Sequence, residues 1–198
     1  MTTNIKCLVL GGSYFIGKAF VSALNQSDKF DVYVANRGTH KNIIGKSNII
    51  ILDRENEESC NVLANYNFDV VVDISCLSTS MFNSTNKYIS APYYIFISSG
   101  LAELKDQSHQ DYTYGEQKRL CEDLVKKSFK NHLIVRPGYV VGEDDYTERF
   151  DKHPTLPLYY YKGTKEIVRQ FIDVQVLAYS LQNMVINNEI GLVKMGYT

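Results

Sequence analysis

The chain has 198 residues, of which 44% are hydrophobic and 22% are charged, and its formal net charge is −1. This is the composition of an ordinary globular protein, and the length suits one domain with a real core. The near-neutral charge argues against a nucleic-acid partner, and no apolar run is long enough to span a membrane. With no signal-peptide pattern at the N-terminus, we expect a cytoplasmic protein.

The cysteines and histidines point to no metal site. The four cysteines form no Cys-x-x-Cys pair, and two of them sit within apolar runs. We expect reduced, partly buried thiols. The four histidines are scattered, with no pair at i, i+4, so metal binding is not expected.

Short apolar runs rich in Val and Ile alternate with amphipathic stretches along the chain. The runs occupy residues 5–11, 30–36, 48–52, 68–75, 93–99 and 132–138. Most are continuous rather than alternating, which is typical of strands buried on both faces of a parallel sheet. Helical spacing of apolar residues follows the first run and recurs within 112–127. The alternation predicts an α/β fold, a Rossmann-like doubly wound parallel sheet in three layers, α/β/α, formed by one domain over 1–198.

The last third of the chain departs from this pattern. Residues 143–165 carry charges, two prolines and a tyrosine cluster. We expect a long surface loop here, a substrate-side flap that extends over about 143–170. A last helix near 173–187 and a short strand at 191–195 are predicted to close the chain.

The first strand leads into a glycine-rich turn made of Gly11, Gly12, Ser13, Tyr14, Phe15, Ile16 and Gly17. In a dinucleotide-binding turn, Gly11 allows the tight turn, Gly12 gives clearance near the pyrophosphate, and Gly17 lets the helix pack close to the strand. The helix N-terminus then offers unpaired N–H groups to the phosphates. An incidental strand-to-helix turn is the alternative, but the strand before and the helix after favour a nucleotide loop.

The end of the second strand carries the residues that would choose between NAD and NADP. An acidic residue there holds the ribose 2′-hydroxyl of NAD, whereas a nearby Arg accommodates a 2′-phosphate. Asn36 stands at the acidic position and Arg37 follows it, which favours NADP. The alternative is a solvated Arg at the start of a loop. Asp53, after the third strand, could accept a hydrogen bond from the adenine amino group or cap a helix.

Tyr-x-x-x-Lys occurs three times in a chain with fifteen tyrosines, so its position decides its meaning. Only Tyr114 and Lys118 fall in a strong helix, where they lie one turn apart on the same face. An ammonium beside a phenol stabilises the phenolate, as an acid–base residue needs. Ser99 ends the strand before this helix and could bind the same substrate oxygen. A surface Tyr–Lys pair beside turn serines is the structural alternative.

Seven segments in order resemble the extended or atypical branch of the short-chain dehydrogenase/reductase superfamily, the nucleotide-sugar epimerases and dehydratases. They are VLGGSYFIG, NRG, FDVVVDIS, YIFISS, YGEQKRLCE, LIVRPGYVVGEDDYTERF and RQFIDVQVLA, and they cover about residues 4–198. The resemblance implies a Rossmann fold, a nicotinamide cofactor, and Ser99, Tyr114 and Lys118 as the catalytic group. It implies further that Lys118 holds the nicotinamide ribose and that Pro137 and Gly138 lie beside the nicotinamide.

Further candidate cofactor contacts are Arg54, Ile74 and Ser75. The sequence departs from the branch in three places. Tyr14 replaces the middle glycine, Val176 stands where relatives often have an acidic residue, and the chain ends at Thr198, where relatives usually continue into further substrate-binding residues.

Three functions are compatible with these motifs. The leading hypothesis is an NAD(P)-dependent epimerase, dehydratase or oxidoreductase that acts on a sugar nucleotide or another small carbonyl or hydroxyl compound. The others are a non-catalytic NADP-binding sensor or RNA-associated module, and a truncated relative that binds cofactor without turnover. In many relatives, helices equivalent to those near 79–90 and 112–128 pair two subunits, so the resemblance also predicts a homodimer.

Overall fold

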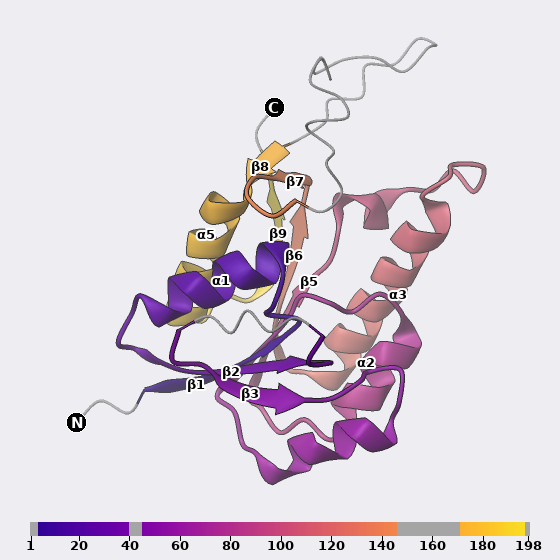
Figure 1. The fold of residues 1–198 in the computed structure, drawn as a ribbon. Helices are drawn as coiled ribbons and strands as arrows, with labels where there is room; N and C mark the ends of the chain where they lie inside the picture. The colour runs from indigo at the N-terminus through magenta and orange to yellow at the C-terminus, as the bar shows by residue number, and fades with distance from the viewer. Residues whose placement is uncertain (1–3, 40–44, 146–170, 197–198) are drawn as a thin grey trace.

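The protein is built on a seven-stranded sheet in which every strand is parallel to its neighbours (Figure 1). The computed structural model describes residues 4–39, 45–145 and 171–196. The spatial order is β3-β2-β1-β4-β5-β6-β9. The bounds are β1 (Ile5–Leu10), β2 (Phe30–Asn36), β3 (Asn48–Ile51), β4 (Val70–Asp73), β5 (Tyr93–Ile97), β6 (Asn131–Pro137) and β9 (Gly191–Met195).

Helices cover both faces of this sheet. On one face α1 (Phe15–Asn25) packs beside α5 (Val174–Asn187), and on the other lie η1 (Glu58–Asn65), α2 (Thr79–Asn86) and α3 (Tyr112–Ser128) (Figure 1). A short 3-10 helix, η2 (Gly100–Glu103), follows β5. The predicted three-layer, Rossmann-like α/β/α fold is therefore confirmed.

Alternate residues of the central strands enter two separate cores. In β1, Cys7 and Val9 pack with α1 and α5, whereas Leu8 and Leu10 pack with η1, α2 and α3. Successive side chains of a strand point to opposite faces, so a strand covered on both sides must be apolar at every position. This is why the sequence shows continuous apolar runs rather than an alternating pattern.

The strand order places the carboxyl ends of β1 and β4 side by side. The chain runs outward from β1 through β2 to β3, then crosses back so that β4 pairs with the other side of β1. In open α/β sheets, ligands bind at this switch point, in the crevice beyond the carboxyl ends of the strands. The loops after β1, β4 and β5 therefore frame the candidate site.

The structure adjusts the predicted boundaries at this same edge. The apolar runs 68–75 and 93–99 predicted longer strands than β4 and β5, which end at Asp73 and Ile97. Beyond these ends, Ile74 and Ser98 each donate one more backbone hydrogen bond, to Leu10 and to Val135, before the chain turns into loops. The helix predicted near 79–90 ends at Asn86. Two strands that the sequence did not predict, β7 (Tyr139–Val141) and β8 (Phe171–Asp173), form a small parallel sheet of their own. Most of the expected flap, 146–170, lies outside the described residues.

The described helices include none that is both long enough and apolar enough to cross a membrane. All four cysteines are free and buried, where the sequence predicted partly buried thiols.

Candidate functional site

The glycine turn follows β1 and begins with a backbone conformation that side chains disfavour. Gly11 has a φ of +88°, and a Cβ built there would lie 2.4 Å from the Cβ of Ser75. A Cβ at Gly17 would lie 2.0 Å from the carbonyl oxygen of Gly11. These contacts bring the first turn of α1 against the loop after β1, and the loop after β4 against that same loop at Gly11. The roles expected for Gly11 and Gly17, a tight turn and close helix packing, fit this geometry.

Gly12 has a different role from the one expected. Its missing Cβ points into the protein, where it would lie 2.8 Å from methyl groups of Val21 and Val34. The space that this glycine leaves is therefore filled by the packing of α1 against β2. Clearance for a pyrophosphate, the role we expected for Gly12, is not what its direction provides.

Tyr14 and Phe15 form the junction between the loop and α1. Tyr14 is the N-cap residue in an extended conformation, its side chain does not cap the helix, and it is 42% exposed. Phe15 has a φ of +42° and a buried side chain. A non-glycine residue in this left-handed region is strained, and such strain often marks ligand sites.

The end of β2 is tied to the glycine turn by one side chain. Asn36 donates from Nδ2 to the Ser13 hydroxyl over 2.8 Å, and its Oδ1 accepts from the backbone N–H of Gly38 over 2.7 Å. Arg37 is exposed, and no described residue pairs with its guanidinium. The loop that would read the adenosine ribose is thus fixed by Asn36, with the Arg37 charge on the surface beside it.

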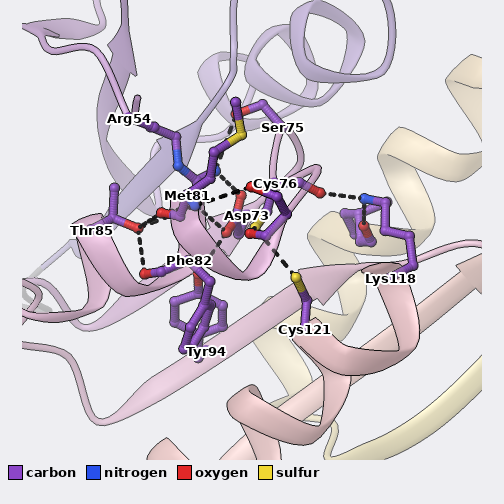
Figure 2. Close-up of polar contacts among 12 residues, drawn as sticks. Arg54, Asp73, Ser75, Cys76, Met81, Phe82, Thr85, Tyr94, Lys118 and Cys121 are labelled. Carbon is purple, nitrogen blue, oxygen red and sulfur yellow. Dashed lines mark hydrogen bonds and ion pairs between the residues drawn. The ribbon is translucent and has the colours of Figure 1, made fainter. Parts of the chain in front are cut away.

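Arg54 enters a buried ion pair that the sequence did not reveal (Figure 2). Its Nη1 and Nη2 lie 2.6 and 2.8 Å from the two carboxylate oxygens of Asp73, at the end of β4. Asp73 is fully buried, and it also accepts a 2.7 Å hydrogen bond from the Tyr94 hydroxyl. Burial lowers the pKa of Arg54, but the charge of Asp73 outweighs it and the net shift is upward.

Arg54 was predicted to contact the cofactor, but its guanidinium is bonded within the protein. Its Nη2 also donates to Thr85 Oγ1 over 3.2 Å, and Nη1 lies 3.3 Å from the Ser75 hydroxyl. Both terminal nitrogens are therefore occupied by protein, so the side chain serves to join the loops after β3 and β4. Asp53 accepts at Oδ1 from the N–H of Glu55, as a turn residue does. The signal for this network in the sequence is an Asp at the end of the apolar run FDVVVD, where a buried carboxylate needs a cationic partner.

Lys118 is buried beneath the carboxyl edge of the sheet. Its Nζ donates to the carbonyl oxygens of Cys76 over 2.8 Å and Ile97 over 3.0 Å, which joins the loop after β4 to the end of β5. Only 2% of the residue is exposed, and burial lowers its pKa. Nζ also lies 5.8 Å from the ring centre of Tyr114, so the two residues share one face of α3 as predicted.

Tyr114 and Ser99 are brought to the same region by a close helix contact. A Cβ at Gly115 would lie 2.2 Å from the carbonyl oxygen of Leu101, so α3 packs tightly on η2, the turn that Ser99 caps. Ser99 Oγ accepts from the N–H of Leu101 over 3.2 Å. The Tyr114 ring is 40% exposed, at the edge where a ligand can reach it.

A second buried network lies one turn further along α3. Glu122, fully buried, accepts from Ser98 Oγ over 2.5 Å and from Arg136 at both carboxylate oxygens, over 2.8 and 2.5 Å. Ser98 precedes Ser99, and Arg136 precedes Pro137, so the network holds the ends of β5 and β6 beside the candidate site. Its signal in the sequence is the four-residue step from Lys118 to Glu122, which places both side chains on one face of the helix.

The remaining contacts lie after β6. Pro137 is buried at its end, and the N–H of Gly138 donates to the carbonyl oxygen of Met195 over 2.8 Å. Asp144 forms an ion pair with Lys18 on α1 and thereby raises the pKa of Lys18. This pair holds the start of the expected flap against the first turns of α1. The described residues contain no group of three His, Cys, Asp or Glu side chains placed to hold a metal.

Comparison with known proteins shows which solved structures share this fold. No protein-family model matches the chain, and no curated protein matches its sequence. WbmH from Bordetella bronchiseptica, solved with NAD+, superposes with a TM-score of 0.73 at 14% identity, over 98% of this chain and 76% of that one. UDP-glucose 4-epimerase from Thermus thermophilus, solved with NAD, gives 0.69 at 16% identity, over 97% and 78%.

A short chain dehydrogenase family protein from Francisella tularensis gives a TM-score of 0.69 at 15% identity, over 98% of this chain and 97% of that one. The chain therefore has the Rossmann-like fold of the short-chain dehydrogenases and nucleotide-sugar epimerases. At these identities the similarity establishes the fold.

Proposed function

We propose that the chain is an NAD(P)-dependent enzyme of the epimerase, dehydratase or oxidoreductase type, acting on a sugar nucleotide or another small carbonyl or hydroxyl compound. The observation that carries this proposal is the position of Lys118. Its ammonium lies at the carboxyl ends of β4 and β5, on the helix face that carries Tyr114. An ammonium has three donors, and the two backbone carbonyls take two, which leaves one for a ribose hydroxyl.

The residues present fit a nicotinamide dinucleotide. The turn from Gly11 to Gly17 carries the tight backbone and the helix N-terminus that bind a diphosphate. We assign the cofactor contacts to Gly11, Gly12, Ser13, Tyr14, Phe15, Ile16, Gly17, Asn36, Arg37, Asp53, Ile74, Ser75, Pro137 and Gly138, with Arg54 placed behind them as a support. When bound, the nicotinamide supplies hydride transfer. Solved structures with this fold hold NAD+ or NAD, which supports the assignment.

In this proposal Tyr114 moves the proton. Its hydroxyl gives a proton to, or takes one from, the reacting oxygen of the substrate, and Ser99 Oγ binds that same oxygen. Lys118 holds the nicotinamide ribose and keeps a positive charge near the phenol. Glu122 acts at a distance, because it fixes Ser98 and Arg136 and so the strand ends on which Ser99 and Pro137 lie.

The catalytic assignment is tested with Tyr114→Phe on the full chain. The solved structures with this fold include a UDP-glucose 4-epimerase and a UDP-N-acetylglucosamine 4-epimerase. UDP-glucose and UDP-N-acetylglucosamine are therefore the first substrates to screen. We expect the variant to retain cofactor affinity and to lose about 10²–10⁴-fold in kcat. Tyr112→Phe is the matched control, since it removes from the same helix a hydroxyl whose one bond within the described part of the chain is to Glu116, and it should keep full activity. Full activity in Tyr114→Phe would refute the assignment. If the wild-type chain bound the cofactor but turned over no substrate, a non-catalytic binding module would be favoured.

The preference for NADP is tested separately with Arg37→Ala. Asn36 stands where an acid would select NAD, and the Arg37 guanidinium lies exposed beside it. We expect the wild type to bind NADPH more tightly than NADH, and the variant to lose this difference while keeping its affinity for NADH. Equal affinities in the wild type would contradict the proposal.

We also propose that two copies associate through α2 and α3. Leu77, from the loop before α2, and Leu120, from α3, are 52% and 41% exposed and offer apolar surface that a second copy would cover. Sedimentation velocity should show a dimer at micromolar concentration. A monomer throughout that range would count against this association.

A further inference from the structure

Two of the four buried cysteines are in direct contact. The Sγ atoms of Cys76 and Cys121 lie 3.9 Å apart, and both residues are fully buried (Figure 2). Cys76 comes from the loop after β4 and Cys121 from α3, so elements 45 residues apart in sequence meet at these sulfurs. Cys7 lies in the core of the opposite face, and Cys60 donates to backbone carbonyls of its own turn.

The pair adjoins the groups that hold Lys118. The Cys76 carbonyl oxygen accepts from Lys118 Nζ, and Cys121 lies three residues after Lys118 on the same helix. Contact with the Cys76 sulfur lowers the pKa of the Cys121 thiol, burial opposes this, and the Lys118 charge adds to the lowering; either sulfur can be the donor in that contact. A thiol with a lowered pKa is the better nucleophile of a pair.

We propose that Cys76 and Cys121 form a reversible disulfide on reaction with a hydroperoxide, and that the disulfide weakens the binding of the nicotinamide cofactor. The first part stands on the contact between the two sulfurs. The second part rests on the proposed function, because it assumes that Lys118 and the loop containing Ile74 and Ser75 hold the cofactor.

The chemistry balances with hydrogen peroxide as the oxidant. The Cys121 thiolate attacks one peroxide oxygen, an S–O bond forms, the O–O bond breaks, and the departing oxygen is protonated to water. The Cys76 thiol then attacks the sulfenic sulfur, an S–S bond forms, the S–O bond breaks, and a second water leaves. Two thiols have lost two electrons and two protons, and one peroxide has become two waters.

The disulfide must disturb the loop after β4. A disulfide bond is about 2.05 Å long, so the sulfurs have to close from 3.9 Å. The Cys76 thiol now donates to the Ser78 carbonyl oxygen over 3.3 Å, and Ser78 caps α2 by accepting from the N–H of Met81. Oxidation removes that thiol donor and draws Cys76 towards α3. Its carbonyl oxygen, the partner of Lys118, moves with it.

The covalent claim is tested on the full chain by mass spectrometry. The reduced protein is exposed to hydrogen peroxide, quenched, unfolded, alkylated with iodoacetamide and digested under non-reducing conditions. We expect two alkylated cysteines, Cys7 and Cys60, a peptide pair joined through Cys76 and Cys121, and four alkylated cysteines after dithiothreitol. Cys60→Ser is the matched control and should still form the pair, whereas Cys121→Ser should form none.

The cofactor claim is tested by titrating NADPH into the reduced and oxidised protein. We expect a dissociation constant about tenfold higher after oxidation, the effect of losing one hydrogen bond, and recovery with dithiothreitol. Four alkylated cysteines after peroxide, or a disulfide that involves Cys7 or Cys60, would overturn the inference even if Cys121→Ser failed to fold. Unchanged affinity in the oxidised protein would overturn its second part. If the reduced protein bound no cofactor, the proposed function would fail while the mass spectrum still decided the disulfide.

Discussion

Arg54→Met tests whether the buried ion pair joins the strand ends of the candidate site. Met keeps much of the length of the side chain but removes the guanidinium that bonds both carboxylate oxygens of Asp73. Of the side chains that bond Asp73 in the structure, Tyr94 alone then remains, and the carboxylate stays in the core. Arg54 is 7% exposed and Asp73 is fully buried, so water cannot replace the lost bonds.

The expected cost follows from that burial. Removing one partner of a buried ion pair typically destabilises a protein by about 3–5 kcal/mol, because the other charge stays buried. A domain of this size is stable by about 5–15 kcal/mol, so the loss is a large share of the total. The free energy of unfolding is measured by urea denaturation followed by circular dichroism.

Arg119→Met on α3 is the matched control for this measurement. Its guanidinium lies 3.5 Å from Glu116, and its side chain is 38% exposed, so the control should cost less than about 1 kcal/mol. The double variant Arg54→Met with Asp73→Leu should recover part of the loss, since no charge stays buried. If Arg54→Met cost no more than the control, the pair would not join these loops as described.

Two further variants probe the neighbouring buried groups. Glu122→Gln keeps the shape of the side chain but removes the charge that Arg136 and Ser98 contact, and we expect about 3 kcal/mol of lost stability by urea denaturation. Tyr94→Phe loses the hydrogen bond to Asp73, which costs about 1–2 kcal/mol at neutral pH. Burial raises the pKa of Tyr94 well above 10, so above about pH 10 the unfolded chain releases a proton that the folded chain keeps. Stability should therefore fall as the pH rises from 9 to 11, less steeply in Tyr94→Phe, and an unchanged slope would contradict the assignment.

The fold could be predicted from sequence because its signals are local. The central strands carry continuous apolar runs rather than alternating ones, as strands covered on both faces do, and the helix from Tyr112 to Ser128 was predicted within a residue. The strands that end at Asp73 and Ile97 were predicted to extend further along the chain. The apolar character of a segment does not show where its backbone pairing with the next strand stops. Beyond that point the chain leaves the sheet and forms the loops of the candidate site.

The buried polar networks could not be predicted in the same way. Arg54 and Asp73 are 19 residues apart, and Glu122 and Arg136 are 14 apart, so only the packed fold shows that they meet. The direction of Gly12 is a similar case, because a glycine in a turn does not show which neighbour fills its missing side chain. Tyr114 and Lys118 were predictable, since their contact depends on one helical turn.

The central claim is that this chain binds a nicotinamide dinucleotide at the turn from Gly11 to Gly17, and an isothermal titration of the reduced full chain tests it most directly. NADPH and NADH are titrated in parallel at up to about 1 mM, the upper end of ordinary enzyme affinities. We predict one saturable site for each chain, with NADPH bound more tightly than NADH. The absence of saturable heat with either dinucleotide would contradict the account.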